Sequence, residues 1–225
     1  SRKKTNRPDR SMMDVDEQTS LETVDTCFAD GDFLGALRAC EDLEILAPDS
    51  AASADIAQRY AKQLMLYMTV DDLDNARHLW RRISDEVKGS TAELEAAWVV
   101  GRKLWQSSDI PGAFASLNYA WRPAIEPYAA KLVEELRARQ FLLLSRAYTV
   151  IGVPAAAAAL GLDEAQALQA CEAKGWHHRP DTGMLAVVPA AIETKPFKGL
   201  EEIQDLAKHV AFLERRSVTK DHSKA

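Results

Sequence analysis

The sequence contains no apolar run approaching the ~20 residues that a membrane-spanning helix needs. Its first residues lack the apolar stretch of a secretory signal. Cysteine is scarce: Cys27, Cys40 and Cys171 form no CxxC pair and lie in helical patterns, which favours buried, reduced thiols. We therefore expect a protein of the cytoplasm and nucleus, with no membrane contact.

Motifs for catalysis and cofactor binding are also missing. The sequence has no glycine-rich phosphate loop of the GxxxxGK[ST] or GxGxxG type, no HExxH and no GxSxG. His177 and His178 are adjacent, so on a strand they would point to opposite faces and could not converge on one ion. We expect no catalytic, cofactor-binding or metal-binding residue; a hydrolase with an unrecognised site is the alternative.

Positive charge is in deficit. The chain carries 34 acidic and 28 basic residues, a net charge of −6, which argues against broad nucleic-acid binding. Several basic residues gather among polar residues at the beginning of the chain, where a solvated tail is expected at residues 1–20. A second disordered tail is expected at residues 217–225.

A pattern of aspartate, an apolar residue and, four positions after the aspartate, alanine occurs three times. It begins at Asp32, Asp72 and Asp109, with spacings of 40 and 37 residues. Each aspartate can accept the free N–H groups at the start of a helix, and each small alanine lets a facing helix approach closely. The pattern predicts a helical-repeat array over residues 21–148.

Two details of this array concern the core. Trp80, Trp98, Trp105 and Trp121 fall in helical phase with apolar neighbours, so we expect all four to pack between repeats. A long helix between residues 128 and 150 is expected to bury a stripe formed by Leu132, Leu136, Leu143 and Ala147.

Short elements follow in residues 149–188. A strand is expected at 149–151, helices at 154–160 and 163–174, and a β-hairpin from strands near 176–178 and 184–188. This order is that of a winged helix, which in many proteins reads DNA with its last helix. Here that helix carries three acidic residues and one lysine, so protein contact is favoured; a nucleic-acid-binding adaptor is the alternative.

The last part of the chain reads as a linker, residues 189–199, and a helix, residues 200–216. Ile203, Leu206, Val210 and Leu213 recur at spacings of 3, 4 and 3, which is a seam suited to a helical bundle. A seam of two heptads is too short to be stable alone. We therefore expect it to pack against a partner.

Several segments together resemble a known family. They are residues 73–83, with the pattern Arg-x-Leu-Trp-x-Arg-Ile, residues 97–105, with Gly-x-x-x-Trp, and the shorter stretches 159–162, 174–176 and 209–214. The chain resembles the PCI-domain family, and within it the smallest subunit of the COP-nine signalosome. The related subunits of the proteasome lid and of translation initiation factor three are the alternatives. The expected fold is all-α with a small β-hairpin: a helical-repeat array, a winged helix and a C-terminal helix.

The resemblance implies a non-catalytic scaffold subunit that supports removal of the ubiquitin-like protein Nedd8 from cullin–RING ligases. The isopeptidase would lie in another subunit, since its His-x-His pair is missing here. Expected partners are other signalosome subunits and, indirectly, cullin–RING ligases, with no nucleic acid. Partner contacts are expected at the winged-helix edge and the terminal seam, through Val150, Ile151, Met184, Leu185, Val187, Ile203, Leu206, Val210 and Leu213.

Overall fold

The computed structural model describes residues 22–46, 53–189, 203–204 and 206–210. The chain divides into two compact units, residues 1–189 and 190–225. The expected tails, nearly all of the expected linker and Leu213 lie outside the described residues. Among the helices that the structure describes, none combines the length and apolarity needed to cross a membrane.

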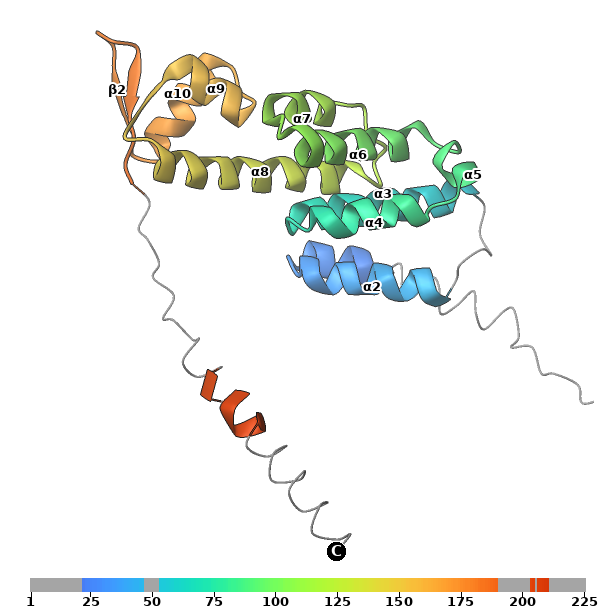
Figure 1. Ribbon diagram of the computed structural model, residues 1–225. Helices are drawn as coiled ribbons and strands as arrows, with labels where there is room; N and C mark the ends of the chain where they lie inside the picture. The colour runs from blue at the N-terminus through green and yellow to red at the C-terminus, as the bar shows by residue number, and fades with distance from the viewer. Residues whose placement is uncertain (1–21, 47–52, 190–202, 205, 211–225) are drawn as a thin grey trace, which may run out of the picture. The chain divides into compact units, whose positions relative to one another are not determined.

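Helices dominate the first unit, as the sequence predicts (Figure 1). A helix over residues 22–29 is followed by α2 (Phe33–Leu46), α3 (Ser53–Thr69), α4 (Leu73–Arg82), α5 (Asp85–Lys88), α6 (Ala92–Arg102), the π-helical segment η1 (Lys103–Ser107), α7 (Ile110–Leu117) and α8 (Glu126–Ala147).

Three of these helices begin at the repeated aspartates. The backbone N–H of the residue three positions later donates to the carboxylate of Asp32, Asp72 and Asp109, at 2.9, 3.1 and 3.0 Å. The alanines of the pattern, Ala36, Ala76 and Ala113, are all buried. The predicted caps and close-packed alanines are therefore confirmed.

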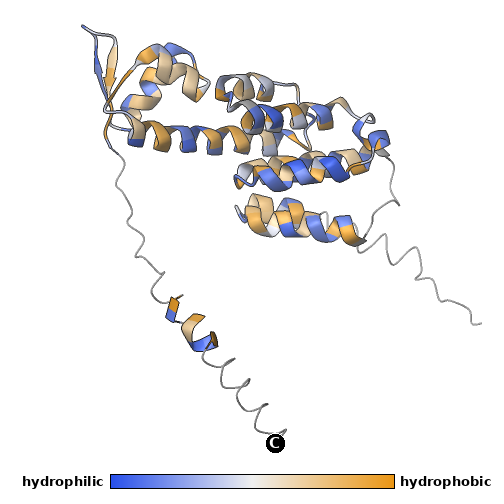
Figure 2. Ribbon diagram, in the orientation of Figure 1, coloured by the Kyte–Doolittle hydropathy of each residue, from blue (hydrophilic) through white to orange (hydrophobic). Residues whose placement is uncertain are grey.

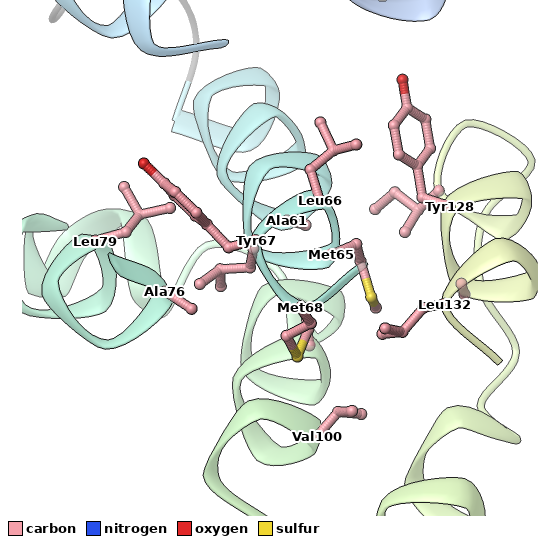
Figure 3. Packing of buried hydrophobic residues seen from close by; sticks show 14 of the residues in the cluster. Ala61, Met65, Leu66, Tyr67, Met68, Ala76, Leu79, Val100, Tyr128 and Leu132 are labelled. Carbon is pink, nitrogen blue, oxygen red and sulfur yellow. The ribbon is translucent and has the colours of Figure 1, made fainter. Parts of the chain in front are cut away.

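Helix α3 lies at the centre of the main core and packs against α2, α4, α6 and α8. Figure 3 shows Tyr67 directed toward Leu79 of α4, and Met65 toward Leu132 of α8. Met65 is fully buried and Met68 is 1% exposed. Each such side chain contributes about 1.5–3 kcal/mol when removed from water, so α3 is a main source of stability for the array.

Helix α8 runs from this core to the β-sheet, and its apolar stripe changes phase on the way. Leu132 and Leu136 are buried as expected, but the next buried leucine is Leu144, whereas Leu143 is 56% exposed and Ala147 is also exposed. The prediction for Leu143 and Ala147 was wrong because the packing partner changes: α8 contacts α3 with its first part and α9 with its last.

The last elements of the first unit form a small module. They are β1 (Val150–Gly152), α9 (Val153–Leu160), α10 (Glu164–Ala173), β2 (His177–Arg179) and β3 (Met184–Ala186). β2 and β3 form the predicted hairpin, and β1 pairs with the other side of β3, so the antiparallel sheet has the order β1-β3-β2. A second core lies under this sheet, formed by Leu144, Ile151, Leu160, Trp176 and Leu185 among others.

Candidate interaction surfaces

The small sheet has one buried and one exposed face. Ile151, Leu185 and Val187 are 7%, 0% and 8% exposed and belong to the second core. Successive side chains of a strand point to opposite faces, so these three cannot share a surface with Val150 and Met184. The side chains of Ile151, Leu185 and Val187 therefore cover the second core, and the expected contact of all five residues with a partner stays a prediction.

The outward-facing residues are apolar. Val150 is 44% exposed and Met184 41%, and they lie on strands that pair directly. The N–H of Val187 donates to the carbonyl of Thr149, which continues the pairing by one step and brings Tyr148 opposite Val188. Tyr148 and Val188 are themselves 50% and 46% exposed. We call Tyr148, Val150, Met184, Ala186 and Val188 the outer sheet face.

Two strand edges border this face. Within the described residues, β3 is paired on both sides, whereas β1 and β2 are each paired on one side only. β2 places His177 opposite Ala186 and Arg179 opposite Met184, so one border of the outer sheet face is polar and basic. An unpaired strand edge presents N–H and C=O groups that can extend the sheet with a strand from another chain.

The second unit contributes a separate apolar surface. Residues 203–204 and 206–210 are helical, and Ile203, Leu206 and Val210 are 62%, 67% and 47% exposed. Their spacing of 3 and 4 residues places them on one face of a helix, where Figure 2 shows hydrophobic residues beside hydrophilic ones. The described part of the predicted seam is thus helical and uncovered within its own unit, and Leu213 lies beyond it.

Comparisons with known proteins identify the family. The model of the CSN8/PSMD8/EIF3K family matches residues 56–196. The chain is 37% identical over 179 residues to COP9 signalosome complex subunit 8 of Xenopus laevis, which covers 78% of this chain and 89% of the frog protein. The chain belongs to the CSN8/PSMD8/EIF3K family. Proteins named COP9 signalosome complex subunit 8 from Arabidopsis thaliana and Dictyostelium discoideum are 32% and 28% identical, over 69% and 71% of this chain and 79% and 82% of their own lengths.

The match to the CSN8/PSMD8/EIF3K family runs from α3 to the residues after β3, which covers most of the main core and all of the second core. It therefore includes the outer sheet face but ends before the described helix of the second unit. The resemblance predicted from residues 73–83 and 97–105 is confirmed at the level of the family.

The ionisable groups of the main core are engaged in contacts between helices. Asp25 accepts hydrogen bonds from Lys62 of α3 at 2.6 Å and from the Tyr128 hydroxyl of α8 at 2.5 Å. Burial and this carboxylate together raise the pKa of Tyr128 far above its usual range. Burial likewise raises the pKa of the Tyr67 hydroxyl, which donates to Glu41 at 2.7 Å. These groups join neighbouring helices, which is a structural use of polar side chains.

The buried cysteine thiols are poor nucleophiles. Burial raises the pKa of Cys40 to about 12 and that of Cys171 to about 11. Only a thiolate attacks effectively, so both groups are unsuited to covalent catalysis near neutral pH. Among the described histidines, His177 is exposed and His178, on the opposite face, is half-buried across from Leu185.

One tryptophan departs from its expected place. Trp80 and Trp98 stack with their ring centroids 4.9 Å apart, in keeping with packing between helices. Trp105 is 42% exposed, with the Arg77 guanidinium 4.3 Å from its ring centroid, so the predicted core position is wrong. The cause is local: Trp105 lies in the π-helical segment η1, whose extra residue per turn shifts the side chains out of α-helical phase.

Two contributors to these surfaces were not singled out from the sequence. Tyr148 and Val188 belong to the outer sheet face, and the alternation 148, 150 and 184, 186, 188 would have revealed them. The sequence gives only an indirect indication of the Arg77–Trp105 contact: both residues lie in the segments that carried the family resemblance.

Proposed function

We propose that this chain is a non-catalytic scaffold subunit of a COP9 signalosome. Support comes from the relatives, which bear the name COP9 signalosome complex subunit 8, and from the family match across most of the main core and all of the second core. The outer sheet face is the observation that carries the proposal: apolar side chains exposed by 41–50% lie beside a strand edge that no described residue pairs with. Covering such a surface with a partner removes apolar area from water and so lowers the free energy.

In this proposal the architecture is that of a PCI domain. The helices over residues 21–148 form an irregular helical-repeat array, residues 149–188 a winged helix, and residues 200–216 a bundle helix. The three aspartate caps and their buried alanines support the repeat interpretation. The order of strand, two helices and hairpin between β1 and β3 supports the winged helix.

The two apolar surfaces receive different partners. A neighbouring subunit extends the sheet with a strand at β1 or β2 and packs against Val150 and Met184 on the outer sheet face. The seam of Ile203, Leu206, Val210 and Leu213 is buried among helices of other subunits. The chain thus supports removal of Nedd8 from cullin–RING ligases by assembly, in cytoplasm and nucleus, while another subunit performs the catalysis.

The outer sheet face is tested by Val150→Asp with Met184→Asp, in the tagged full chain expressed in cells. Two carboxylates buried against an apolar partner, without compensating charges, would cost several kcal/mol. We expect recovery of the partner subunits to fall at least about tenfold, since 1.4 kcal/mol already changes an equilibrium by that factor.

The matched control is Leu34→Asp with Ile45→Asp on α2, where the two side chains are 58% and 77% exposed. Circular dichroism of both double variants would establish that each is folded. Equal recovery of partners by the sheet variant and the unsubstituted chain would contradict the proposed role of this face.

A further inference from the structure

A third candidate surface lies on α4 and α6, away from the outer sheet face. The two helices are side by side in Figure 1 and are joined by two ring contacts. Trp80 of α4 stacks on Trp98 of α6, and Arg77 of α4 lies over Trp105 of η1, which continues α6. The later residue of α4, Trp80, meets the earlier tryptophan, Trp98, and the earlier residue, Arg77, meets the later one, Trp105. The helices therefore run antiparallel along this face.

Three arginines occupy the surface. Arg77 and Arg81 are one turn apart on α4, and Arg102 is one turn after Trp98 and just under one turn before Trp105. Arg81 and Arg102 are exposed. We call Arg77, Arg81, Arg102, Trp98 and Trp105 the arginine–tryptophan surface.

Among the described residues, these guanidinium groups have no acidic partner. Arg82, Arg122 and Arg139 form ion pairs with Glu44, Glu93 and Asp71. In the part of the chain that the structure describes, Arg77, Arg81 and Arg102 form no ion pair. Three unpaired cations on one face of a chain with net charge −6 mark a place where anionic groups are attracted.

The aromatic part is held in position from behind. η1 is a π-helical segment, a distortion that is frequent at functional sites. The Lys103 ammonium in this segment donates to the carbonyl of Gly112 at 2.9 Å and to the Ser116 hydroxyl at 2.7 Å, which fastens η1 to α7. Trp105 is thereby presented outward on an anchored backbone, with one ring face covered by Arg77.

We propose that the arginine–tryptophan surface binds an acidic peptide segment of a partner protein. Carboxylates of the segment pair with Arg81 and Arg102, and an apolar side chain rests against the exposed part of Trp105. Arginine suits this role because its planar fork binds carboxylates in bidentate fashion and also stacks on aromatic rings. The surface is separate from those of the proposed function, and the inference does not depend on it.

Charge at the two ends of the surface favours a short peptide over nucleic acid. Asp74 lies one turn before Arg77 and Glu95 one turn before Trp98, and both are exposed. Because the helices are antiparallel, these carboxylates lie at opposite ends of the surface. A continuous phosphate backbone would meet them at both ends, whereas a peptide with a few central carboxylates fits between them.

The test uses the full chain and a synthetic probe, an acetylated and amidated peptide of sequence Glu-Glu-Leu-Glu-Glu. The control peptide replaces each glutamate with glutamine. The readout is the indole N–H resonance of Trp105 in NMR spectra, assigned by its loss in Trp105→Phe. We expect the acidic peptide to shift this resonance in a saturable, salt-sensitive manner, and the glutamine peptide to leave it in place.

Two charge-reversed variants decide whether the surface is specific. Arg81→Glu with Arg102→Glu should weaken acidic-peptide binding at least about tenfold, because attraction becomes repulsion. Arg38→Glu with Arg146→Glu, at exposed sites on α2 and α8, makes the same change in net charge and should leave the affinity within about twofold.

Three results would overturn the proposal. They are the absence of a shift with the acidic peptide, an equal loss of binding in both charge-reversed variants, and tighter binding of a short thymidine oligonucleotide than of the peptide. The first two would show that the surface has no selective acidic ligand. The third would assign the surface to nucleic acid.

Discussion

At the scale of single residues, the aspartate caps determine where α2, α4 and α7 begin. Asp72 accepts from the backbone N–H of Asn75 at 3.1 Å and from its side-chain amide at 2.7 Å. Asp72→Ala should lower the free energy of unfolding by about 1 kcal/mol, whereas Asp72→Asn keeps an acceptor and should lose much less. Urea denaturation of the two variants checks this; equal losses would contradict the capping role.

Two glycines with positive φ allow the cost of backbone strain to be measured separately from the cost of steric overlap. Gly31 has φ +80° and open space where a Cβ would lie, whereas at Gly161, with φ +61°, a Cβ would lie 2.3 Å from Cγ of Phe114. Both alanine variants carry the left-handed penalty of about 1–2 kcal/mol. Gly161→Ala should lose about 1–3 kcal/mol more through overpacking. Thermal or urea unfolding measures the difference, and equal stability of the two variants would show that Phe114 moves aside freely.

At the scale of elements, α8 links the two cores through a pair of arginines. Arg139 donates to the carbonyl oxygens of Met68 and Thr69 at the end of α3, and to Asp71 at 3.1 Å. Arg137 donates to the carbonyl of Leu160 at the end of α9, at 3.2 Å. Each arginine thus supplies donors to carbonyl groups at the end of a helix; the Met68 carbonyl also accepts from the backbone N–H of Asp71.

These contacts predict which helix end is destabilised when each arginine is replaced. Arg139→Ala should destabilise the chain by about 2 kcal/mol, because charged hydrogen bonds to part-buried carbonyls are lost. Arg139→Lys should recover only part of this, since an ammonium lacks the planar fork. Hydrogen exchange should rise at the end of α3 in Arg139→Ala and at the end of α9 in Arg137→Ala; the same exchange pattern in both variants would contradict the assignment.

Local signals predicted many of the elements. The caps at Asp32, Asp72 and Asp109, and the order of strands and helices after residue 149, follow from side-chain chemistry within a few positions. The errors arose where a distant contact or a local irregularity of the helix decides which side chains are buried. Leu143 is exposed because α8 changes its partner along its length, and Trp105 because a π-helical segment shifts the phase.

At the candidate site in the sheet, the sequence likewise predicted the local elements but not their packing. The sequence predicted its strands and the apolar character of Val150, Ile151 and Leu185. It did not separate the face that covers the second core from the face that is exposed, because that requires knowing which side of the sheet α9 and α10 cover. The structure supplies this information and leaves Val150 and Met184 on the outward face.

At the scale of the whole molecule, the chain has cores of its own and additional apolar surfaces that those cores do not use. The seam of the second unit is the clearest test of a partner outside the chain. Leu206→Asp with Val210→Asp should reduce entry into the complex while the first unit remains folded, since both side chains are exposed. Co-purification of partners is the measurement, with circular dichroism as the check of folding.

The control for the seam lies on the same helix. Gln204→Asp with Lys208→Asp alters charge on the faces beside the seam, and both positions are exposed. This variant should retain its partners. Undiminished co-purification of the seam variant, or equal loss in both variants, would remove the argument that the seam itself is buried in the assembly.

Affinity purification of the full chain from cell extract, with mass spectrometry of its stoichiometric partners, tests the central claim most directly. The account predicts recovery of the signalosome subunits, with cullins at lower yield. Recovery of proteasome-lid or initiation-factor subunits instead would retain the fold and contradict the assigned complex, and the absence of any stoichiometric partner would contradict the scaffold role.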